Sequence, residues 1–251
     1  MARRLLEARA LHQKIRAIDV RDSRILNSVS AQDLQRALAG RQLSSAIRHG
    51  KRLFLQIDSG LWLALHLGLT GWPVFLAESG AEPRHTRLRI DFEDGAALAF
   101  DDLRIFGEVG LTESPQAFLS QRGIGPDALQ MDREAFLAAM SGRKGKIKPA
   151  LLDQGLIAGL GNLYADEALF QSGICPQARS LKRERLEALY SAIQEVLRTS
   201  LASNADFEKL PNSYLLPHRR PGEACPWDGT ALQRIKIAGR TSYYCPQHQK
   251  K

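Results

Sequence analysis

The amino-acid sequence predicts an α+β protein whose first half is mainly antiparallel β structure and whose second half is helical and ends in a short β-hairpin. Three observations predict this. Short apolar runs separated by turn residues fill the first half, apolar positions with a helical period dominate the second, and two pairs of metal-type ligands flank the last segment. The chain has 251 residues, 44% of them hydrophobic and 25% charged, so it can form one or two domains with buried cores.

The first half is expected to hold one short helix and a series of strands. Ser30 and Asp33 form a capping box and Gly40 supplies a stop, so a helix is predicted between them. The segments 58–60 and 94–95, Asp-Ser-Gly and Asp-Gly, are typical of hairpin turns, and the second is typical of a type I′ turn. The apolar runs next to these turns cover residues 53–57, 61–69, 88–92 and 96–100.

The apolar pattern lapses between residues 112 and 127, and this interruption predicts the domain junction. Helical periodicity follows it over residues 132–140, 147–154, 162–171 and 180–201. The last of these is expected to be a surface helix with one buried stripe, formed by Leu186, Leu189, Ile193, Val196, Leu197 and Leu201. We therefore divide the chain into a β domain at residues 1–125, a helical domain at 126–203, and a linker with a hairpin at 204–251.

The charge of the chain favours an anionic partner. Its 35 Lys and Arg residues outnumber its 27 Asp and Glu residues, and much of the net charge of +8 sits in residues 143–148 and beyond residue 211. Clustered cations are typical of nucleic-acid binding, and a basic surface without a partner is the alternative. We expect a cytoplasmic location, because no apolar stretch suits a bilayer span or a signal peptide and three cysteines suit a reducing compartment.

Two ligand pairs near the end of the chain predict a zinc site. Cys225 and Asp228 are separated by sixteen residues from Cys245 and His248. Two such knuckles at opposite ends of a hairpin can bring four side chains to one tetrahedral ion, and zinc accepts thiolate, imidazole and carboxylate ligands. The alternative is a metal-free hairpin whose cysteines only pack. Cys175 stands alone and is expected to be a small buried residue.

A glycine-rich turn before residues 162–171 is expected to bind phosphate. Gly159 and Gly161 precede Asn162 at the start of the predicted helix, where backbone N–H groups attract an anion. A dinucleotide-binding loop is excluded, because the third glycine and the preceding strand are missing.

Several of these segments together resemble the bacterial formamidopyrimidine-DNA glycosylases. The resemblance is carried by residues 147–176, 104–107, 66–71 and 240–245, the last three reading Arg-Ile-Phe-Gly, His-Leu-Gly-Leu-Thr-Gly and Arg-Thr-Ser-Tyr-Tyr-Cys. It implies a β-sandwich domain joined to a helix-two-turn-helix domain with a zinc-ribbon hairpin that holds one structural zinc ion. It also implies a monomeric, nucleoid-associated bacterial enzyme of base-excision repair whose partner is damaged double-stranded DNA.

The activity that the resemblance implies is the removal of oxidised purines, namely 8-oxoguanine and formamidopyrimidines. In that family the damaged base is flipped out of the duplex, and an amine attacks C1′ of its sugar to form a Schiff base. The base leaves, and β- and δ-elimination then cut the strand. The resemblance therefore implies a bifunctional DNA glycosylase and apurinic or apyrimidinic lyase.

The resemblance also assigns roles to individual residues. Lys51 and Arg240 match catalytic positions that take part in elimination. DNA contacts are expected from His66, His85, Arg104, Arg143, Lys148 and Asn162. The wedge that fills the gap left by the extruded base is expected to be Leu69, Arg104 and Phe106. Taken singly, the cations could be ordinary surface charges, and Leu69 and Phe106 could be core residues of strands.

The beginning of the chain departs from the family pattern. The resemblance assigns the attacking amine to an N-terminal proline followed by glutamate, whereas Met1 aligns with the middle of the family's first helix. One hypothesis is a reading frame started at an internal methionine, and it is favoured because Lys51 and Arg240 are both present. A second is a protein that binds damaged DNA without cutting it. A third is a zinc-ribbon transcription regulator, which has no need of a wedge.

Overall fold

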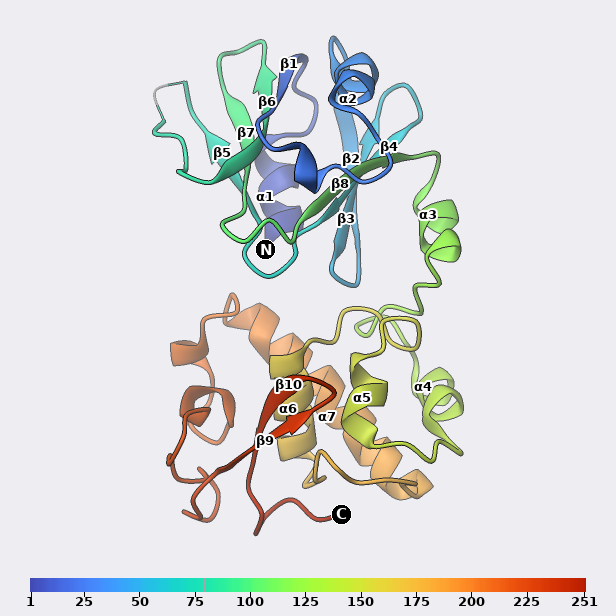
Figure 1. Ribbon diagram of the computed structural model, residues 1–251, viewed down its shortest axis with the longest axis vertical. Helices are drawn as coiled ribbons and strands as arrows, with labels where there is room; N and C mark the ends of the chain where they lie inside the picture. The colour runs from blue at the N-terminus through green and yellow to red at the C-terminus, as the bar shows by residue number, and fades with distance from the viewer. Residues whose placement is uncertain (79) are drawn as a thin grey trace. The chain divides into compact units, whose positions relative to one another are not determined.

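Figure 1 shows the computed structural model of the chain, which describes residues 1–78 and 80–251. The chain divides into two compact units, Met1–Gly123 and Ile124–Lys251, and each is described by itself. The first is mainly β structure and the second mainly helical, which confirms the predicted α+β class. No helix in the described part of the chain combines the length and the apolar character that a membrane crossing requires.

The first unit contains two four-stranded sheets. One has the order β1-β6-β7-β5 and consists of β1 (Ile15–Val20), β5 (Trp72–Leu76), β6 (Thr86–Phe92) and β7 (Ala97–Asp101). The other has the order β2-β3-β4-β8 and consists of β2 (Leu43–His49), β3 (Arg52–Ile57), β4 (Trp62–His66) and β8 (Glu108–Thr112). Neighbouring strands are antiparallel throughout, as predicted.

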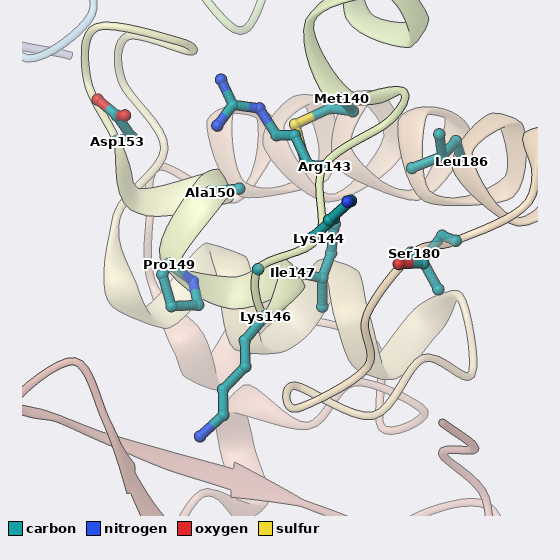
Figure 2. Close-up of a pocket in the computed structure, with 12 residues that line it drawn as sticks. Met140, Arg143, Lys144, Lys146, Ile147, Pro149, Ala150, Asp153, Ser180 and Leu186 are labelled. Atoms are coloured by element: carbon teal, nitrogen blue, oxygen red, sulfur yellow. The ribbon is translucent and has the colours of Figure 1, made fainter.

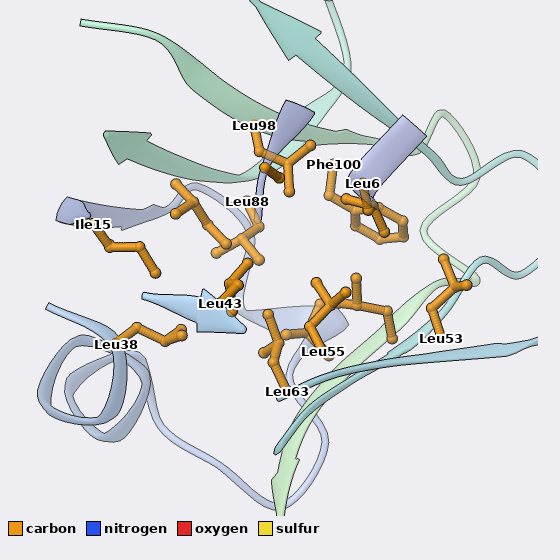
Figure 3. Close-up of a cluster of buried hydrophobic side chains, with 14 of the residues drawn as sticks. Leu6, Ile15, Leu38, Leu43, Leu53, Leu55, Leu63, Leu88, Leu98 and Phe100 are labelled. Atoms are coloured by element: carbon orange, nitrogen blue, oxygen red, sulfur yellow. The ribbon is translucent and has the colours of Figure 1, made fainter. Parts of the chain in front are cut away.

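The core of this unit lies between the two sheets. Along β6 every second residue is buried, which is the pattern of a strand with one face in a core. Figure 3 shows side chains of the two sheets pointing toward one another, with Leu55 and Leu63 from one sheet and Leu88 and Leu98 from the other. Each such leucine stabilises the fold by about 1.5–3 kcal/mol relative to an exposed position. Two helices also bury side chains there: α1 (Ala2–Arg9) and α2 (Ala31–Leu38).

The short helices of this unit follow their N-terminal caps. Helix α2 begins after Ser30 with the predicted capping box to Asp33. Helix α3 (Pro115–Gln121), however, lies where the sequence predicted only an interruption. Ser114 accepts a hydrogen bond from the Ala117 N–H, and Pro115 occupies the first turn, where its missing N–H costs nothing. Pro115 therefore begins a helix, although the sequence analysis placed it in the interruption between the two domains.

Of the two predicted hairpin turns, one agrees with the prediction and the other has a different turn type. The β3–β4 hairpin turns at Gly60, whose φ of +95° suits the predicted turn. Between β6 and β7 the predicted type I′ turn is wrong, because Gly95 has a φ of +88° but Asp94 is not among the described residues with positive φ. The Gly95 N–H donates to the Phe92 carbonyl, so the loop spans residues 93–95 and ends in a left-handed glycine.

Four strands have no counterpart among the predicted apolar runs. These are β1, β2, β5 and β8, and the segment Leu43–His49 shows the reason, since Ser, Arg and His interrupt its apolar residues. Strand β4 is also shorter than the predicted run 61–69, because it ends at His66 and the chain turns at Gly68, where φ is +62°.

The second unit is built around α6. Its helices are α4 (Arg133–Met140), α5 (Ile147–Leu152), α6 (Asn162–Gln171) and α7 (Arg183–Ala202), and its hairpin is β9 (Gln233–Ile237) with β10 (Arg240–Tyr244). Residues 165–170 of α6 are all buried, because α5, α7 and β10 all pack against this helix. All four predicted helices and the hairpin are present. The predicted stripe of α7 is buried at Leu186, Leu189, Ile193 and Val196, whereas Leu201 is exposed.

Candidate nucleic-acid interface and metal centre

The buried carboxylate of Asp102 organises two loops at one end of the first unit. Its Oδ1 accepts from the Thr70 hydroxyl at 2.5 Å, and its Oδ2 accepts from the Gly107 N–H at 2.7 Å. Burial by itself raises the pKa of Asp102, but the hydrogen bonds from Thr70 and from backbone N–H groups outweigh it and hold the pKa below the ordinary value. The ionised carboxylate therefore ties the β4–β5 loop to the β7–β8 loop.

The three predicted wedge residues stand on these two loops. The Leu69 side chain is 71% exposed and Phe106 is 50% exposed, so neither is a core residue of a strand. The guanidinium of Arg104 lies 4.8 Å from the centre of the Phe106 ring. A Cβ added at Gly68 would lie 2.5 Å from the Phe106 carbonyl carbon, so the loops touch backbone to backbone. The structure thus brings Leu69, Arg104 and Phe106 together on one rim, formed by two loops that Asp102 ties to each other.

The backbone conformation of Ile105, which lies between Arg104 and Phe106, explains why these two wedge residues face outward. Ile105 adopts a φ of +56°, which a β-branched residue rarely adopts. Its side chain packs on the core, while Arg104 and Phe106 on either side of it face outward. The unusual backbone conformation therefore places two wedge residues in solvent and their neighbour in the core.

Other predicted DNA-contacting residues of the first unit lie at the same end of the sandwich. Strand register places Arg52 opposite His66 and His66 opposite Glu108, and the exposed Lys51 directly precedes Arg52 in the β2–β3 turn. Burial, followed by the Arg52 charge, lowers the pKa of His66, and the Gly68 N–H donates to its Nδ1 at 3.2 Å. The imidazole is therefore held neutral with its Nδ1 already in use.

His85 joins this end from the other sheet. The Asp102 N–H donates to the His85 carbonyl at 3.0 Å, and the His85 N–H donates to Asp101 Oδ1 at 2.9 Å. The backbone of His85 is thus fixed against the segment that carries Arg104, and the ring is partly exposed.

In the second unit, the start of α6 lies beside the β9–β10 hairpin, and both carry residues predicted to contact phosphate. Ala238 and Gly239 have φ values of +47° and +73°, which turn the chain so that β10 begins with the exposed Arg240. The Nδ2 of Asn162, the first residue of α6, donates to the Thr241 carbonyl at 2.9 Å. Its buried Oδ1 has no hydrogen-bond partner within residues 1–78 and 80–251. Asn162 and Arg240 therefore lie beside the positive end of a helix dipole.

Lys148, one of the predicted DNA-contacting residues, lies inside the second unit. The side chain is fully buried, and its ammonium donates to Asp166 Oδ1 at 2.5 Å and also to the hydroxyl of Ser242. Burial lowers the pKa of Lys148, and the carboxylate of Asp166 opposes that shift. In this structure the ammonium of Lys148 is paired inside the unit rather than exposed, and its DNA contact stays a prediction.

Arg143 lies at the rim of a pocket of about 310 Å³ (Figure 2). Its Nε donates to the Ala139 carbonyl at 2.9 Å, which leaves the rest of the guanidinium at the surface. Lys144 and Lys146 line the same pocket, and its apolar part includes Met140, Ile147 and Leu186. Three of the four cations in the predicted basic cluster are thus accessible, and the fourth is the buried Lys148.

Three of the four predicted metal ligands converge. One donor atom each of Cys225, Asp228 and Cys245 lies within 4.8 Å of the others. Burial raises the pKa of the Cys225 thiol to about 11, whereas hydrogen bonding, chiefly from the Thr230 backbone, lowers that of Asp228 to about 2. Two thiols around one carboxylate form a donor set that suits zinc, which deprotonates the thiols it binds.

His248 does not join this group in the structure. Its Nε2 lies 2.7 Å from the Phe170 carbonyl, and its ring centre lies 4.1 Å from that of Trp227. Three of the four predicted ligands therefore converge in this structure, and the role of His248 as the fourth stays a prediction. A histidine that donates Nε2–H to a carbonyl keeps the lone pair of Nδ1 for a metal, which is the arrangement common in zinc sites.

The sequence analysis did not single out the buried acidic residues Asp102, Asp166 and Glu167. Asp102 stands beside Arg104 with no pattern that marks it as buried. The signal for Asp166 was visible, since Asp166 and Glu167 interrupt an otherwise apolar run in α6, and buried carboxylates require partners. Both α6 acids are fully buried. Glu167, whose pKa is raised by burial, accepts from the N–H groups of Leu215 and Leu216.

Comparison with known proteins agrees with this arrangement. Residues 1–109 match the family model of the formamidopyrimidine-DNA glycosylase N-terminal domain, and residues 123–210 match that of the formamidopyrimidine-DNA glycosylase H2TH domain. The formamidopyrimidine-DNA glycosylase of Trichormus variabilis is 35% identical, with 98% of this chain and 96% of the relative covered. That of Solibacter usitatus is 36% identical, with 95% and 93% covered.

Solved structures show the same likeness over both units. The Lactococcus lactis formamidopyrimidine-DNA glycosylase bound non-covalently to DNA containing an abasic site has a TM-score of 0.89 and 30% identity, with 99% of this chain and 96% of that chain covered. The same Lactococcus lactis enzyme in complex with DNA containing FAPY-dG has a TM-score of 0.88 and 30% identity, with 100% and 97% covered. With two family models matched along the chain and relatives above 30% identity over nearly its full length, the chain belongs to the formamidopyrimidine-DNA glycosylase family.

Proposed function

We propose that this protein is a base-excision-repair DNA glycosylase and abasic-site lyase that removes oxidised purines from duplex DNA. The observation that carries the proposal is the exposed rim of Leu69, Arg104 and Phe106, fixed by a buried carboxylate. Exposing apolar side chains to water costs free energy. A protein that binds DNA without unstacking a base gains nothing in return for that cost. The solved relatives were captured with abasic-site, FAPY-dG and 8-oxo-G DNA, which supports the same class of substrate.

The wedge acts by replacing the base that leaves the stack. Extruding a nucleotide costs a few kcal/mol of stacking and pairing, least for a damaged pair. Leu69 and Phe106 fill the gap and exclude water from it, and Arg104 is held against the Phe106 ring where it can face the unpaired partner base. A wedge whose two loops are already tied together by Asp102 loses less conformational entropy on binding than one on free loops.

The phosphates near the lesion are bound by cations and by a helix N-terminus. Arg240 and Asn162 supply a guanidinium and an amide beside the start of α6, and Lys51 supplies an ammonium on the first unit. His66, His85 and Arg143 contribute further DNA contacts. Lys51 and Arg240, placed at the phosphates that leave, take part in elimination by stabilising the departing charge.

The chemistry that these residues serve has four steps. An amine forms a bond to C1′ as the bond from C1′ to the base breaks, and the base takes up a proton. The C1′–O4′ bond then breaks as O4′ takes up a proton, which opens the sugar ring and leaves an iminium between the amine and C1′. Loss of a C2′ proton from this iminium expels the 3′ phosphate, and a second elimination expels the 5′ phosphate. The family resemblance assigns the amine to an N-terminal proline ahead of the segment that matches Met1.

We also propose that one structural zinc ion holds the hairpin. Cys225, Asp228 and Cys245 fit zinc by the convergence of their donor atoms, and His248 is proposed as the fourth ligand through Nδ1. Bound zinc would supply no step of the reaction. It would fix the ends of the hairpin whose tip carries Arg240. A cytoplasmic, nucleoid-associated location follows from a substrate of this kind.

Covalent trapping tests the proposal. The chain as printed and a form extended by an N-terminal Pro-Glu opening are each incubated with an 8-oxoguanine duplex and borohydride, with an undamaged duplex as the matched control. We expect the extended form to be trapped on the damaged duplex and to nick it. If neither form is trapped while both prefer damaged DNA, the protein binds lesions without cutting. Equal affinity for damaged and intact DNA would instead favour a regulator.

A further inference from the structure

A buried charge cluster in the second unit touches the strand that carries Arg240. Asp166 on α6 accepts from the Lys148 ammonium at 2.5 Å and from Nη2 of Arg219 at 2.9 Å. The side chains of Asp166 and Lys148 are completely buried, and that of Arg219 is 15% exposed. Two cations thus share one carboxylate, and the cluster keeps an excess positive charge almost without water.

Together the members of the cluster contact three successive residues of β10. Arg219 donates to the Thr241 carbonyl at 2.9 Å, and Lys148 donates to the Ser242 hydroxyl. The Tyr243 N–H donates to Asp166 Oδ2 at 3.4 Å, and the Arg219 guanidinium lies 4.9 Å from the centre of the Tyr243 ring.

These contacts cover the three residues that directly follow Arg240. Residues 241–243 cannot shift unless the bonds to the cluster break, and the Asn162 amide holds the same Thr241 carbonyl from the start of α6. The backbone of Arg240 is therefore fixed relative to Asn162 by buried charges rather than by the turn of the hairpin alone.

We propose that Asp166 is a positioning residue for phosphate recognition, which acts through Arg219 and Lys148 to hold Arg240 beside the N-terminus of α6. The inference rests on the proposed function, because Arg240 is taken to contact DNA. It gives Lys148 a different part from the direct contact that the resemblance implied, since the ammonium anchors the hairpin from inside. It also adds Arg219, which no sequence motif marked.

The test measures binding to a duplex that contains a tetrahydrofuran abasic-site analogue, by fluorescence anisotropy at several salt concentrations. The variants are Asp166→Asn and Arg219→Met, each alone and combined with Arg240→Ala. If Asp166 acts through Arg240, Asp166→Asn weakens binding by about tenfold and weakens it no further when Arg240 is already alanine. The salt dependence falls by the equivalent of about one phosphate contact.

Ser200→Ala is the matched control, because it removes a partly buried hydrogen bond in the same unit that joins Ser200 to Tyr164 rather than to β10. It is expected to leave both affinity and salt dependence unchanged. If Asp166→Asn fails to fold, the pair Lys148→Met with Asp166→Asn removes both buried charges and takes its place. Circular dichroism reports folding for every variant.

Two outcomes overturn the inference. One is an equal loss from Asp166→Asn with and without Arg240, and the other is a loss in Ser200→Ala as large as that in Asp166→Asn. The failure of the proposed function looks different, since the wild-type protein would then bind the abasic-site duplex no better than intact DNA.

Discussion

Leu69 and Leu103 form a natural comparison between single residues, because both are exposed leucines at the loop end of the same unit but only Leu69 is assigned to the wedge. Leu69 is 71% exposed and Leu103 is 56% exposed. Changing either to alanine alters stability little, since surface substitutions act within about 0.5 kcal/mol.

The prediction is that Leu69→Ala and Phe106→Ala each lower the rate of 8-oxoguanine excision about tenfold, because a loss of ~1.4 kcal/mol of stacking in the gap corresponds to that factor. Leu103→Ala is expected to retain the wild-type rate. Single-turnover kinetics on a damaged duplex, with the extended form of the chain, measure both. A loss in Leu103→Ala that equals the loss in Leu69→Ala would remove the distinction between a wedge residue and another exposed leucine of this unit.

Asp102 provides a prediction about pH. Its folded-state pKa is lowered, so the stabilisation from its carboxylate is present above the unfolded pKa of about 4 and is lost as the pH falls through the folded pKa. Asp102→Asn leaves buried N–H donors facing an amide and is expected to cost about 1–3 kcal/mol at pH 7.

Urea denaturation of Asp102→Asn and wild-type protein at pH 7 and at pH 3 measures this dependence. The difference in unfolding free energy between the two proteins should shrink at the lower pH. A difference that stays constant across this range would show that the ionised form of Asp102 contributes nothing to the rim.

The β9–β10 hairpin is the element whose order is expected to depend on the proposed zinc ion. Two strands alone are marginally stable in water, and the ends of this hairpin meet at Cys225, Asp228 and Cys245. Removal of zinc by a chelator is expected to lower the melting temperature of the second unit and to weaken DNA binding, because the hairpin carries Arg240.

Metal analysis and hydrogen exchange check that prediction. Purified protein should contain about one zinc per chain, and Cys245→Ser should contain almost none. Exchange should rise in residues 225–248 on chelation, while β6 and β7 keep their protection as internal controls. Unchanged exchange in the hairpin after complete loss of zinc would contradict a structural ion.

For the whole molecule, the net charge of +8 predicts a steep dependence of DNA affinity on salt. Arg143→Ala is expected to weaken binding to damaged and intact DNA by the same factor and to reduce the salt slope by about one, because a phosphate contact carries no lesion information. Phe106→Ala should do the reverse, with loss of lesion preference and no change of slope. A change in preference with Arg143→Ala would mean that this arginine reads the lesion.

The sequence by itself determined the α+β class, the helices of the second unit, the capping box at Ser30 and the position of the hairpin. These features depend on neighbours along the chain, where periodicity and caps act. Family resemblance added the wedge residues, and the exposure of Leu69 and Phe106 agrees with that assignment.

Only the tertiary structure decided which charges face solvent and which lie inside. Lys148 and Arg143 stand in one basic cluster of the sequence, yet the first is buried against Asp166 and the second lies at the surface. No pattern in the sequence indicated that Asp102 holds the rim or that Arg219 contacts β10. The reason is physical: the burial of a charge depends on partners distant in the chain, and periodicity and spacing carry no information about those partners.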